Sequence, residues 1–369
     1  MEQTKNTCEV STKDVLKHYL ASIVIYGLIL FVITFCPLFN ETIENEKLNY
    51  IVFFIIYYLG YVIFALPIFL KFRPQSILES RNLTICRYFK RQFDKGLTTK
   101  EWLEKITPTQ KESQSMMILF VKAFFGVYTI NLLCNNYLTS LDYNFDFLRE
   151  MFSQAYQYAA SEGLFNGILQ YIDDTADMWT KLTITLTTLI LAFSYITELE
   201  LFKNKVKSVD TTPLGVISCL ICYPPLILLT NKLIPYLTQE LIPAEILGLR
   251  IVLNILIVLI HLGSLFAIFR LGTKSGNLTN CGIVTGFPYN IIRHPDYTMQ
   301  MCGYVLLTIP VYFIDSISIF EKLILVLGTC LWLYIYYLRA ITEERHLIKD
   351  EEYQKYVEKV KYRFIPKVF

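Results

Sequence analysis

Charged residues are scarce in this sequence, since Asp, Glu, Lys and Arg together make up 18% of its 369 residues. A typical soluble chain carries about 25%. Glycine and proline, with 15 and 13 residues, are too few for a linker-rich or disordered chain. The formal net charge is only +2, so no basic surplus points to nucleic acid as a partner. The nine cysteines are scattered, several of them within apolar runs, and form no disulfide framework.

Long hydrophobic runs dominate the chain instead. Apolar residues account for 54% of the sequence and aromatic residues for 15%, and the mean hydropathy is +0.41. A helix that crosses a hydrocarbon core of about 30 Å needs about 20 apolar residues. The runs of this length lie at 18–39, 50–72, 116–138, 180–202, 216–238, 248–270, 298–317 and 320–341. The sequence therefore predicts an all-α, polytopic integral membrane protein with about eight transmembrane helices.

Proline and loop length refine this prediction at three of the runs. Pro224-Pro225 predicts a kink or break in the fifth span, and Pro310 interrupts the seventh. Only a few residues around Asp315 and Ser318 separate the seventh and eighth spans. These two spans are expected to form a tight antiparallel hairpin.

The basic residues are unevenly divided between alternate loops. If the N-terminus lies on the inner face, the inner segments hold 27 of the 34 Lys and Arg residues. Those segments are 1–17, 71–115, 203–215, 270–297 and 339–369. The outer loops hold only Lys47 and Arg149 and carry thirteen acidic residues. Because basic residues favour the inner face, both termini are expected on the cytosolic or matrix side.

We divide the chain into an N-terminal membrane region, 1–245, and a C-terminal region with an amphipathic tail, 246–369. The inner loop 73–115 is expected to contain two short helices, 84–95 and 99–106, the second with Thr98 and Glu101 at capping-box spacing. The outer segment 139–178 is rich in Phe and Tyr. We expect it to form one or two helices that lie in the lipid interface or against a partner protein.

Two dense polar motifs stand at the ends of the predicted C-terminal hairpin. The first runs from Gly286 to Tyr297 and contains Arg293-His294-Pro295. The second runs from Arg339 to Leu347 and contains Glu343-Glu344. Two antiparallel helices bring such ends side by side. An Arg, a His, a Tyr and two Glu side chains are therefore expected to meet at the membrane boundary.

The two motifs resemble signatures of a known family. The runs Gly286…Pro288-Tyr289…Arg293-His294-Pro295-Xaa-Tyr297 and Glu343-Glu344-Xaa-Xaa-Leu347 are similar to those of isoprenylcysteine carboxyl methyltransferases and phospholipid N-methyltransferases. Tyr353-Xaa-Xaa-Tyr356 and Arg363-Phe-Ile-Pro366 continue the resemblance, which covers about 250–369. Met299 stands where that family usually has Gly, and a Phe-Gly pair usual before the paired tyrosines is missing. The ending Tyr362-Arg-Phe-Ile-Pro366 also resembles the tail of the sterol reductases, which bind NADPH.

The resemblance implies a methyltransferase that uses S-adenosylmethionine. Arg293 suits the carboxylate of that cofactor as a bidentate donor, and Glu343 or Glu344 suits its ammonium group or its ribose hydroxyls. Tyr297 and Tyr289 are expected to complete the cofactor pocket.

The methyl acceptor would be a lipid, either a prenylcysteine carboxylate or a phospholipid amine. A carboxylate needs no general base. An amine must lose a proton, for which His294 or Glu344 is the expected catalytic residue. His294 is also expected to hydrogen-bond the polar end of the cofactor. The usual membrane of this family in eukaryotes is the endoplasmic reticulum.

The sequence leaves two further functions open. A catalytically degenerate chain with the same fold, serving as a structural subunit of a larger membrane complex, is favoured by Met299, by the missing Phe-Gly pair and by the aromatic segment 139–178. For that alternative the mitochondrial inner membrane is a possible site. NADPH-dependent sterol reduction is the third alternative and the weaker match.

Several side chains also have plain structural interpretations. Arg293 and His294 can meet lipid phosphates at the interface, and Arg339 can form an ion pair with Glu343 one helical turn later. The spacing of Tyr353 and Tyr356 favours packing of an amphipathic helix over catalysis. Helix packing is also the expected role of His261 and of Cys219-Xaa-Xaa-Cys222, so no metal site is predicted.

Overall fold

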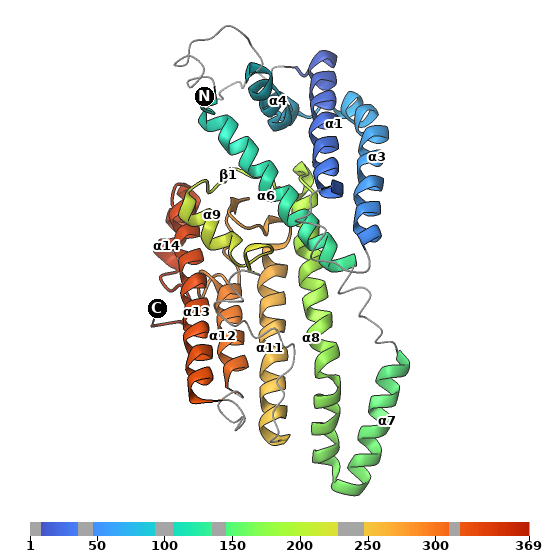
Figure 1. Cartoon of the computed structure of the whole chain (residues 1–369), viewed down its shortest axis with the longest axis vertical. Helices are drawn as coiled ribbons and strands as arrows, with labels where there is room; N and C mark the ends of the chain where they lie inside the picture. The colour runs from blue at the N-terminus through green and yellow to red at the C-terminus, as the bar shows by residue number, and fades with distance from the viewer. Residues whose placement is uncertain are drawn as a thin grey trace, which may run out of the picture. The chain divides into compact units, whose positions relative to one another are not determined.

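The computed structural model describes residues 9–35, 47–92, 106–134, 145–227, 247–309 and 318–368 (Figure 1). Two compact units divide the chain, 1–127 and 128–369. Both are built mainly from helices, and six of these are long and apolar enough to cross a membrane. The protein is therefore an all-α membrane protein, as its composition predicts.

The first unit contains three membrane-length helices and a short amphipathic one. Its elements are α1 (Thr12–Phe35), α3 (Lys47–Phe72), η1 (Gln75–Glu79), α4 (Arg81–Gln92) and most of α6 (Gln110–Leu132), which ends in the second unit. Helix α4 corresponds to the predicted helix 84–95. The second predicted helix, 99–106, and the cap at Thr98 lie almost wholly outside the described residues. The same capping pattern occurs later, at Thr109 and Glu112, where it begins α6.

Polar contacts join α1 to α4 within this unit. His18 Nδ1 lies 2.7 Å from the hydroxyl of Ser80, and the amide of Asn82 donates to Ser22 at 2.9 Å. Ser22, Ser80 and Asn82 are buried. These pairs satisfy side chains that would otherwise be unpartnered among apolar helices.

The second unit contains the remaining elements, in which helices follow one another as packed neighbours. They are α7 (Phe145–Glu162), α8 (Leu164–Ile196), η3 (Glu200–Phe202), β1 (Ser208–Val209), α9 (Pro213–Leu220), α11 (Leu247–Leu271), η4 (Gly272–Lys274), β2 (Thr279–Asn280), α12 (Pro295–Thr308), α13 (Ile319–Leu347) and α14 (Glu351–Lys359). Helix α8 packs against α7 and α11, α11 against α12, α12 against α13, and α13 against α9 (Figure 1).

Specific side chains fix the packing of α8. Asp173 accepts hydrogen bonds from Arg250 at 2.6 Å and from Asn254 at 3.0 Å, which joins α8 to α11. Gly167 allows α7 to approach closely, because a Cβ at that position would lie 2.3 Å from the Cβ of Ala159. The predicted outer segment 139–178 thus forms two helices over its described part, α7 and the first half of α8.

Six of the eight predicted spans correspond to membrane-length helices, and the exact number of eight is not confirmed. Helix α9 ends at Leu220, before Pro224-Pro225, in agreement with the predicted break. The rest of the predicted fifth span, 228–238, lies outside the described residues. Helix α12 has 14 residues, about 21 Å, and the remainder of the seventh span, 310–317, also lies outside them.

A short antiparallel ladder, which the sequence did not indicate, holds two loops of the second unit together. Ser208 pairs with Asn280 and Val209 with Thr279. Asp350 reinforces this ladder, because it accepts hydrogen bonds from Asn280 at 2.8 Å and from Lys207 at 3.1 Å. The same carboxylate caps the start of α14 by accepting from the backbone N–H of Glu352 at 2.9 Å. Asp350 thereby fixes the two loops that carry β1 and β2 to the C-terminal helix, α14.

Candidate functional site

The second unit contains an open cavity of about 320 Å³ where the N-terminus of α12 meets the C-terminal part of α13. Its walls combine tyrosines with charged and amide side chains. The lining residues that carry polar groups include Tyr195, Tyr223, Asn277, Tyr289, Arg293, His294, Asp296, Tyr297, Gln300, Tyr304, Tyr336, Arg339 and Glu343. Leu191, Ile227, Ile268 and Leu271 add an apolar side. A cavity of this size falls at the small end of the range for ligand sites, about 300–1,000 Å³.

The C-terminal tail holds the first motif in place through its backbone. The N–H groups of Arg293 and His294 donate to the carbonyl groups of Tyr362 and Arg363, at 2.9 and 3.0 Å. His294 occupies the position before the first turn of α12, and Pro295 begins the helix. Because proline lacks an N–H and its φ suits a helix start, the motif both ends the loop and starts α12.

Glu344 joins three cationic or imidazole groups behind the cavity wall. Its Oε1 lies 3.1 Å from Nε of Arg293 and 3.1 Å from Nε2 of His294. Its Oε2 accepts from Nε of Arg363 at 3.0 Å. Glu344 is not one of the described residues that line the cavity. It therefore orients Arg293 and His294 from behind, whereas Arg293 and His294 themselves face the cavity.

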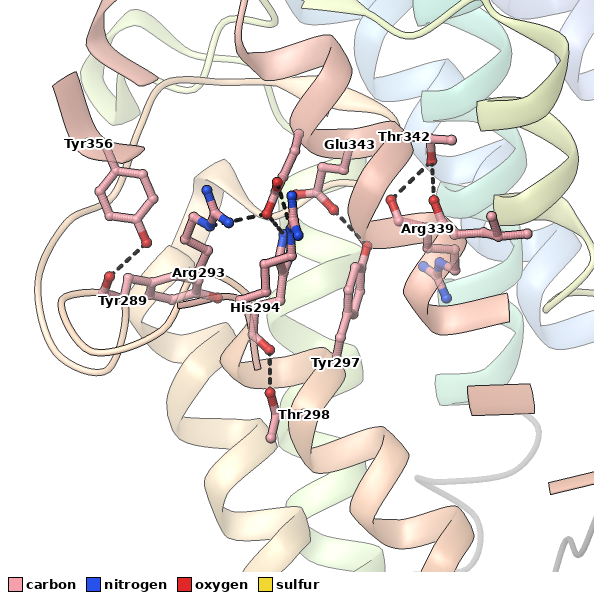
Figure 2. Close-up of polar contacts among 12 residues, drawn as sticks. Tyr289, Arg293, His294, Tyr297, Thr298, Arg339, Thr342, Glu343 and Tyr356 are labelled. Carbon is pink, nitrogen blue, oxygen red and sulfur yellow. Dashed lines mark hydrogen bonds and ion pairs between the residues drawn. The ribbon is translucent and has the colours of Figure 1, made fainter. Parts of the chain in front are cut away.

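Glu343 lies on the cavity side of α13. Tyr297 donates its hydroxyl to Oε2 of Glu343 at 2.8 Å, and Figure 2 shows the two side chains facing each other across α12 and α13. Adjacent glutamates in the sequence thus have different surroundings, because successive residues on a helix point about 100° apart.

Arg339 contacts aromatic rings and an amide, and forms no ion pair with Glu343, which was one structural interpretation left open by the sequence. Its guanidinium lies 4.9 Å from the ring centroid of Tyr297 and 5.1 Å from that of Tyr336, and it donates to Oδ1 of Asn277 at 2.9 Å. Cation–π contacts and the Asn277 side chain replace the carboxylate as partners. Asn277 and Tyr297, from other parts of the fold, and Tyr336, from α13 itself, are the partners of Arg339 in place of Glu343.

Tyr289 lines the cavity, as expected, and its backbone is fixed by the tail helix. Tyr356 donates its hydroxyl to the carbonyl group of Tyr289 at 2.6 Å (Figure 2). Tyr289, Tyr353 and Tyr356 form one buried apolar cluster. Burial raises the pKa of Tyr353 and of Tyr356 above the ordinary value of 10.0, so both phenols stay protonated. Packing is thus the role of the paired tyrosines, in agreement with their helical spacing.

Several cavity residues were not identified from the sequence. Asp296 stands inside the first motif and accepts from Ser264 at 2.5 Å. Asn277 bridges Arg339 and the hydroxyl of Tyr223, to which it donates at 3.0 Å. The signal for Asp296 was available, because it lies between two predicted site residues. Tyr223 and Asn277 come from distant loops without a motif.

Met299, which stands where the family that the motifs resemble usually has Gly, points away from the cavity. It does not occur among the described residues that line it. Its sulfur instead packs on α11, where a Cβ added to Gly263 would lie 2.8 Å from it. A glycine on the facing helix thus accommodates the larger side chain.

No family model, no curated protein and no solved structure matches this chain. Within the described ranges, no group of three or more His, Cys, Asp or Glu side chains is placed to hold a metal ion. The chemistry of the cavity walls is therefore the basis on which a function can be assigned.

Proposed function

We propose that this chain is a membrane-embedded methyltransferase that transfers a methyl group from S-adenosylmethionine to a lipidic acceptor. The observation that carries the proposal is the convergence of Arg293, His294, Tyr297 and Glu343 on one cavity. These residues come from the two motifs that resemble the isoprenylcysteine and phospholipid methyltransferases. The cofactor, when bound, supplies an electrophilic methyl group on a sulfonium.

Arg293 has the donors that the cofactor carboxylate requires. Its side chain is only 7% exposed, and its Nε is buried near Glu344 without a hydrogen bond among the described residues. Its terminal nitrogens make no hydrogen bond to the described part of the chain. A planar guanidinium whose terminal nitrogens have no other partner can bind a carboxylate with two parallel hydrogen bonds.

Two acids on the cavity wall suit the cationic and hydroxyl groups of the cofactor. Glu343 engages Tyr297 through Oε2, which leaves Oε1 to accept from a ribose hydroxyl of the cofactor and, for an amine acceptor, to take its proton. Asp296 lies on the same wall. Tyr195 and Tyr223 also line the cavity and add aromatic surface that suits an adenine. The donor set therefore fits a zwitterionic amino acid attached to a nucleoside.

Cavity size favours S-adenosylmethionine over NADPH. NADPH carries two nucleotides and an additional phosphate, whereas S-adenosylmethionine carries one nucleoside and no phosphate. A volume of about 320 Å³ suits the smaller molecule. This supports the methyltransferase over the sterol reductase.

Methyl transfer to a bound acceptor depends mainly on alignment. Arg293 and His294 are held by Glu344 and by the tail backbone, so the cofactor end of the cavity is rigid before binding. Glu344 already contacts two guanidinium groups and an imidazole, which makes it a poor proton acceptor. We therefore assign Glu344 to positioning, and for an amine acceptor we assign proton removal to Glu343. The lipid acceptor and an endoplasmic reticulum location with both termini on the cytosolic side belong to the same proposal.

Calorimetry on the purified full chain in detergent tests the proposal, with S-adenosylmethionine and NADPH in separate titrations. Wild-type protein is expected to bind the former, and Arg293→Ala to weaken that binding by about 2–4 kcal/mol, as for loss of a buried charge-assisted pair. Arg363→Ala is the matched control. It removes the same charge from Glu344 at a side chain that is 31% exposed and does not line the cavity, so binding is expected to change by less than about 1 kcal/mol. Binding of neither cofactor would overturn the enzymatic function, and binding of NADPH alone would replace it by the reductase.

A structural subunit of a membrane complex is the second candidate, supported by exposed aromatic residues on α7 and on the start of α8. Phe152 is 64% and Phe165 is 72% exposed. Helix α8 spans 33 residues, about 50 Å, which exceeds the hydrocarbon core by about 20 Å. In native mass spectrometry of a gently solubilised membrane, this candidate expects the chain only within a defined larger assembly. A free, S-adenosylmethionine-binding chain would contradict it.

A further inference from the structure

A second, smaller cavity adjoins the main one. It measures about 20 Å³ and shares Asn277, Tyr297, Arg339 and Glu343 with the main cavity. Its remaining walls carry Asp210, Gly215, Ser218, Cys219, Leu278, Thr279, Thr342 and His346. Glu343 thus borders both spaces, and Figure 2 shows it on α13 between Arg339 and the loop of the first motif.

Asp210 presents an unpartnered carboxylate oxygen in this smaller cavity. The residue follows β1 and is only 3% exposed. Its Oδ1 accepts from the N–H of Thr212 at 2.9 Å, but Oδ2 is buried without a hydrogen bond among the described residues. A terminal nitrogen of Arg345 lies 4.0 Å from Oδ2, beyond hydrogen-bond distance. A buried carboxylate oxygen in this state is costly, so it needs a donor that the protein does not supply.

The cavity has the size and the polar walls that one water molecule requires. A volume of about 10–15 Å³ or more holds a water, provided that two to four polar partners surround it. Asp210 and Glu343 offer carboxylate oxygens, and Ser218 and Thr342 are hydroxyl residues of its walls. A water there would bridge groups that are not themselves in hydrogen-bond contact.

His346 connects the smaller cavity to the end of α13. Its Nε2 lies 3.1 Å from the hydroxyl of Ser208 in β1, and Ser208 is half-buried. The charged groups that face His346 are Asp210 from the turn after β1, Lys349 beyond α13, and Glu343 one turn earlier. Glu343 is faced by Tyr297 and Asp296 from α12, by Arg339 from its own helix and by Cys219 from α9.

We propose that the smaller cavity holds a bridging water and is the route by which a proton leaves the methyl-transfer site. This rests on the proposed function and narrows its acceptor to an amine. The entering ammonium first passes one proton to Glu343, and from Glu343 the proton moves through the water to Asp210 and His346, which release it beside Ser208. The neutral nitrogen then forms the N–CH₃ bond as the S–CH₃ bond breaks, giving an alkylammonium and a neutral thioether. A carboxylate acceptor yields a neutral ester and releases no proton, so it needs no such route.

Asp210 and His346 act through Glu343 and touch neither donor nor acceptor, so their effect must appear in the pH dependence. The experiment uses the full chain in phospholipid vesicles with S-adenosylmethionine as donor. The acceptors are phosphatidylethanolamine, a primary amine, and a prenylated cysteine, a carboxylate. Asp210→Asn keeps the acceptor for Thr212 but cannot carry a proton, and His346→Gln keeps a polar partner for Ser208. Glu352→Gln is the control, because it removes an acid that is 67% exposed on α14.

We expect methylation of the amine, and a loss of rate of about 10–100-fold in both variants at neutral pH, a moderate share of what proton transfer contributes in enzymes. Donor affinity by calorimetry should stay unchanged. The rates of both variants should recover toward alkaline pH, where the amine enters without its extra proton, and Glu352→Gln should follow wild type throughout. The midpoint of thermal unfolding of each variant shows whether it is folded. If Asp210→Asn does not fold, the test uses His346→Gln.

Other outcomes separate the proton route from the proposed function. Methylation of the amine with unchanged rate and pH profile in both variants would overturn the route and leave the methyltransferase intact. Methylation of the carboxylate acceptor alone would also overturn the proton route and leave the methyltransferase intact. Absence of donor binding in wild type would overturn the methyltransferase and the route together.

Discussion

Nε2 of His294 lies 3.1 Å from Oε1 of Glu344, although the two residues are 50 positions apart. The contact joins the start of α12 to the end of α13 and is completed by Arg293 and Arg363. One carboxylate thus fixes both cavity-facing residues of the first motif and the tail that runs beside them. These contacts suit a positioning role for Glu344 and not a role as a reacting group.

Neutralising Glu344 should therefore harm the fold and the cavity together. Glu344→Gln leaves the Arg293 guanidinium buried without a counter-charge, and removal of one partner from such a group costs about 3–5 kcal/mol. We expect a lower midpoint of thermal unfolding in detergent and weaker binding of S-adenosylmethionine. Glu343→Gln should lower binding with a smaller effect on unfolding, because its hydrogen bond with Tyr297 can be kept by an amide. Equal unfolding midpoints for the two variants would contradict the division of roles.

Stability at low pH should depend on Asp350. Burial acts to raise the pKa of this carboxyl, but hydrogen bonds from Asn280, from the N–H of Glu352 and from Lys207 outweigh it and hold the pKa below the ordinary 3.8. A pKa lowered by folding adds stability that is complete above pH 3.8 and is lost as the pH falls through the lower folded value. Asp350→Asn should flatten the acid limb of a plot of unfolding free energy against pH. Asp350→Ala should also cost about 0.5–2 kcal/mol at neutral pH through loss of the helix cap.

Glu351→Gln is the control for this measurement, since it stands beside Asp350 in the first turn of α14 but is exposed. Its acid limb should keep the wild-type slope. An unchanged slope in Asp350→Asn would show that the carboxyl carries no net stabilisation from its three partners.

Replacing Met299 should affect packing and leave the cavity unchanged. The Met299 side chain fills the space over Gly263, so Met299→Gly leaves a void and adds a glycine within α12. We expect a loss of about 2–5 kcal/mol in unfolding free energy and no gain in affinity for S-adenosylmethionine. Cys302→Ala, an exposed position on the same helix, serves as the control and should be near neutral. Tighter cofactor binding by Met299→Gly would mean that the side chain blocks the cavity.

Both termini are expected on the same face of the membrane, given the 27-to-2 division of basic residues between inner and outer loops. The expectation follows from the preference of Lys and Arg for the inner face. Small epitope tags at each end of the chain, probed in sealed vesicles of one orientation, provide the measurement. A tag inside α7, which the same charge division predicts on the opposite face, is the control for vesicle integrity. Exposure of the two terminal tags on different sides would require an odd number of spans.

Composition alone determined the class of this protein, because 54% apolar residues in runs of about 20 can be solvated only by lipid or by one another. Local chemistry determined helix ends, such as the start of α13 at Ser318 and Glu321, where a capping box forms within four residues. The motifs around Arg293 and Glu343 could likewise be placed together, since a helical hairpin leaves little choice about which ends meet. The two runs interrupted by proline, 216–238 and 298–317, were counted as spans from hydropathy, but each continues outside the described residues, so the number of eight is not confirmed.

Tertiary structure alone decided which of the predicted site residues face the cavity and which support it. Glu343 and Glu344 are neighbours in the sequence, yet one borders the cavity and the other binds Arg293 and His294 from behind. The guanidinium of Arg339 lies over the rings of Tyr297 and Tyr336 and does not pair with Glu343, one helical turn later. Asp210 and Asn277, in loops without a motif, reach the same place through the β1–β2 ladder. The physical reason is that a periodic pattern fixes the direction of a side chain relative to its own helix, whereas its partners depend on residues far away in the chain.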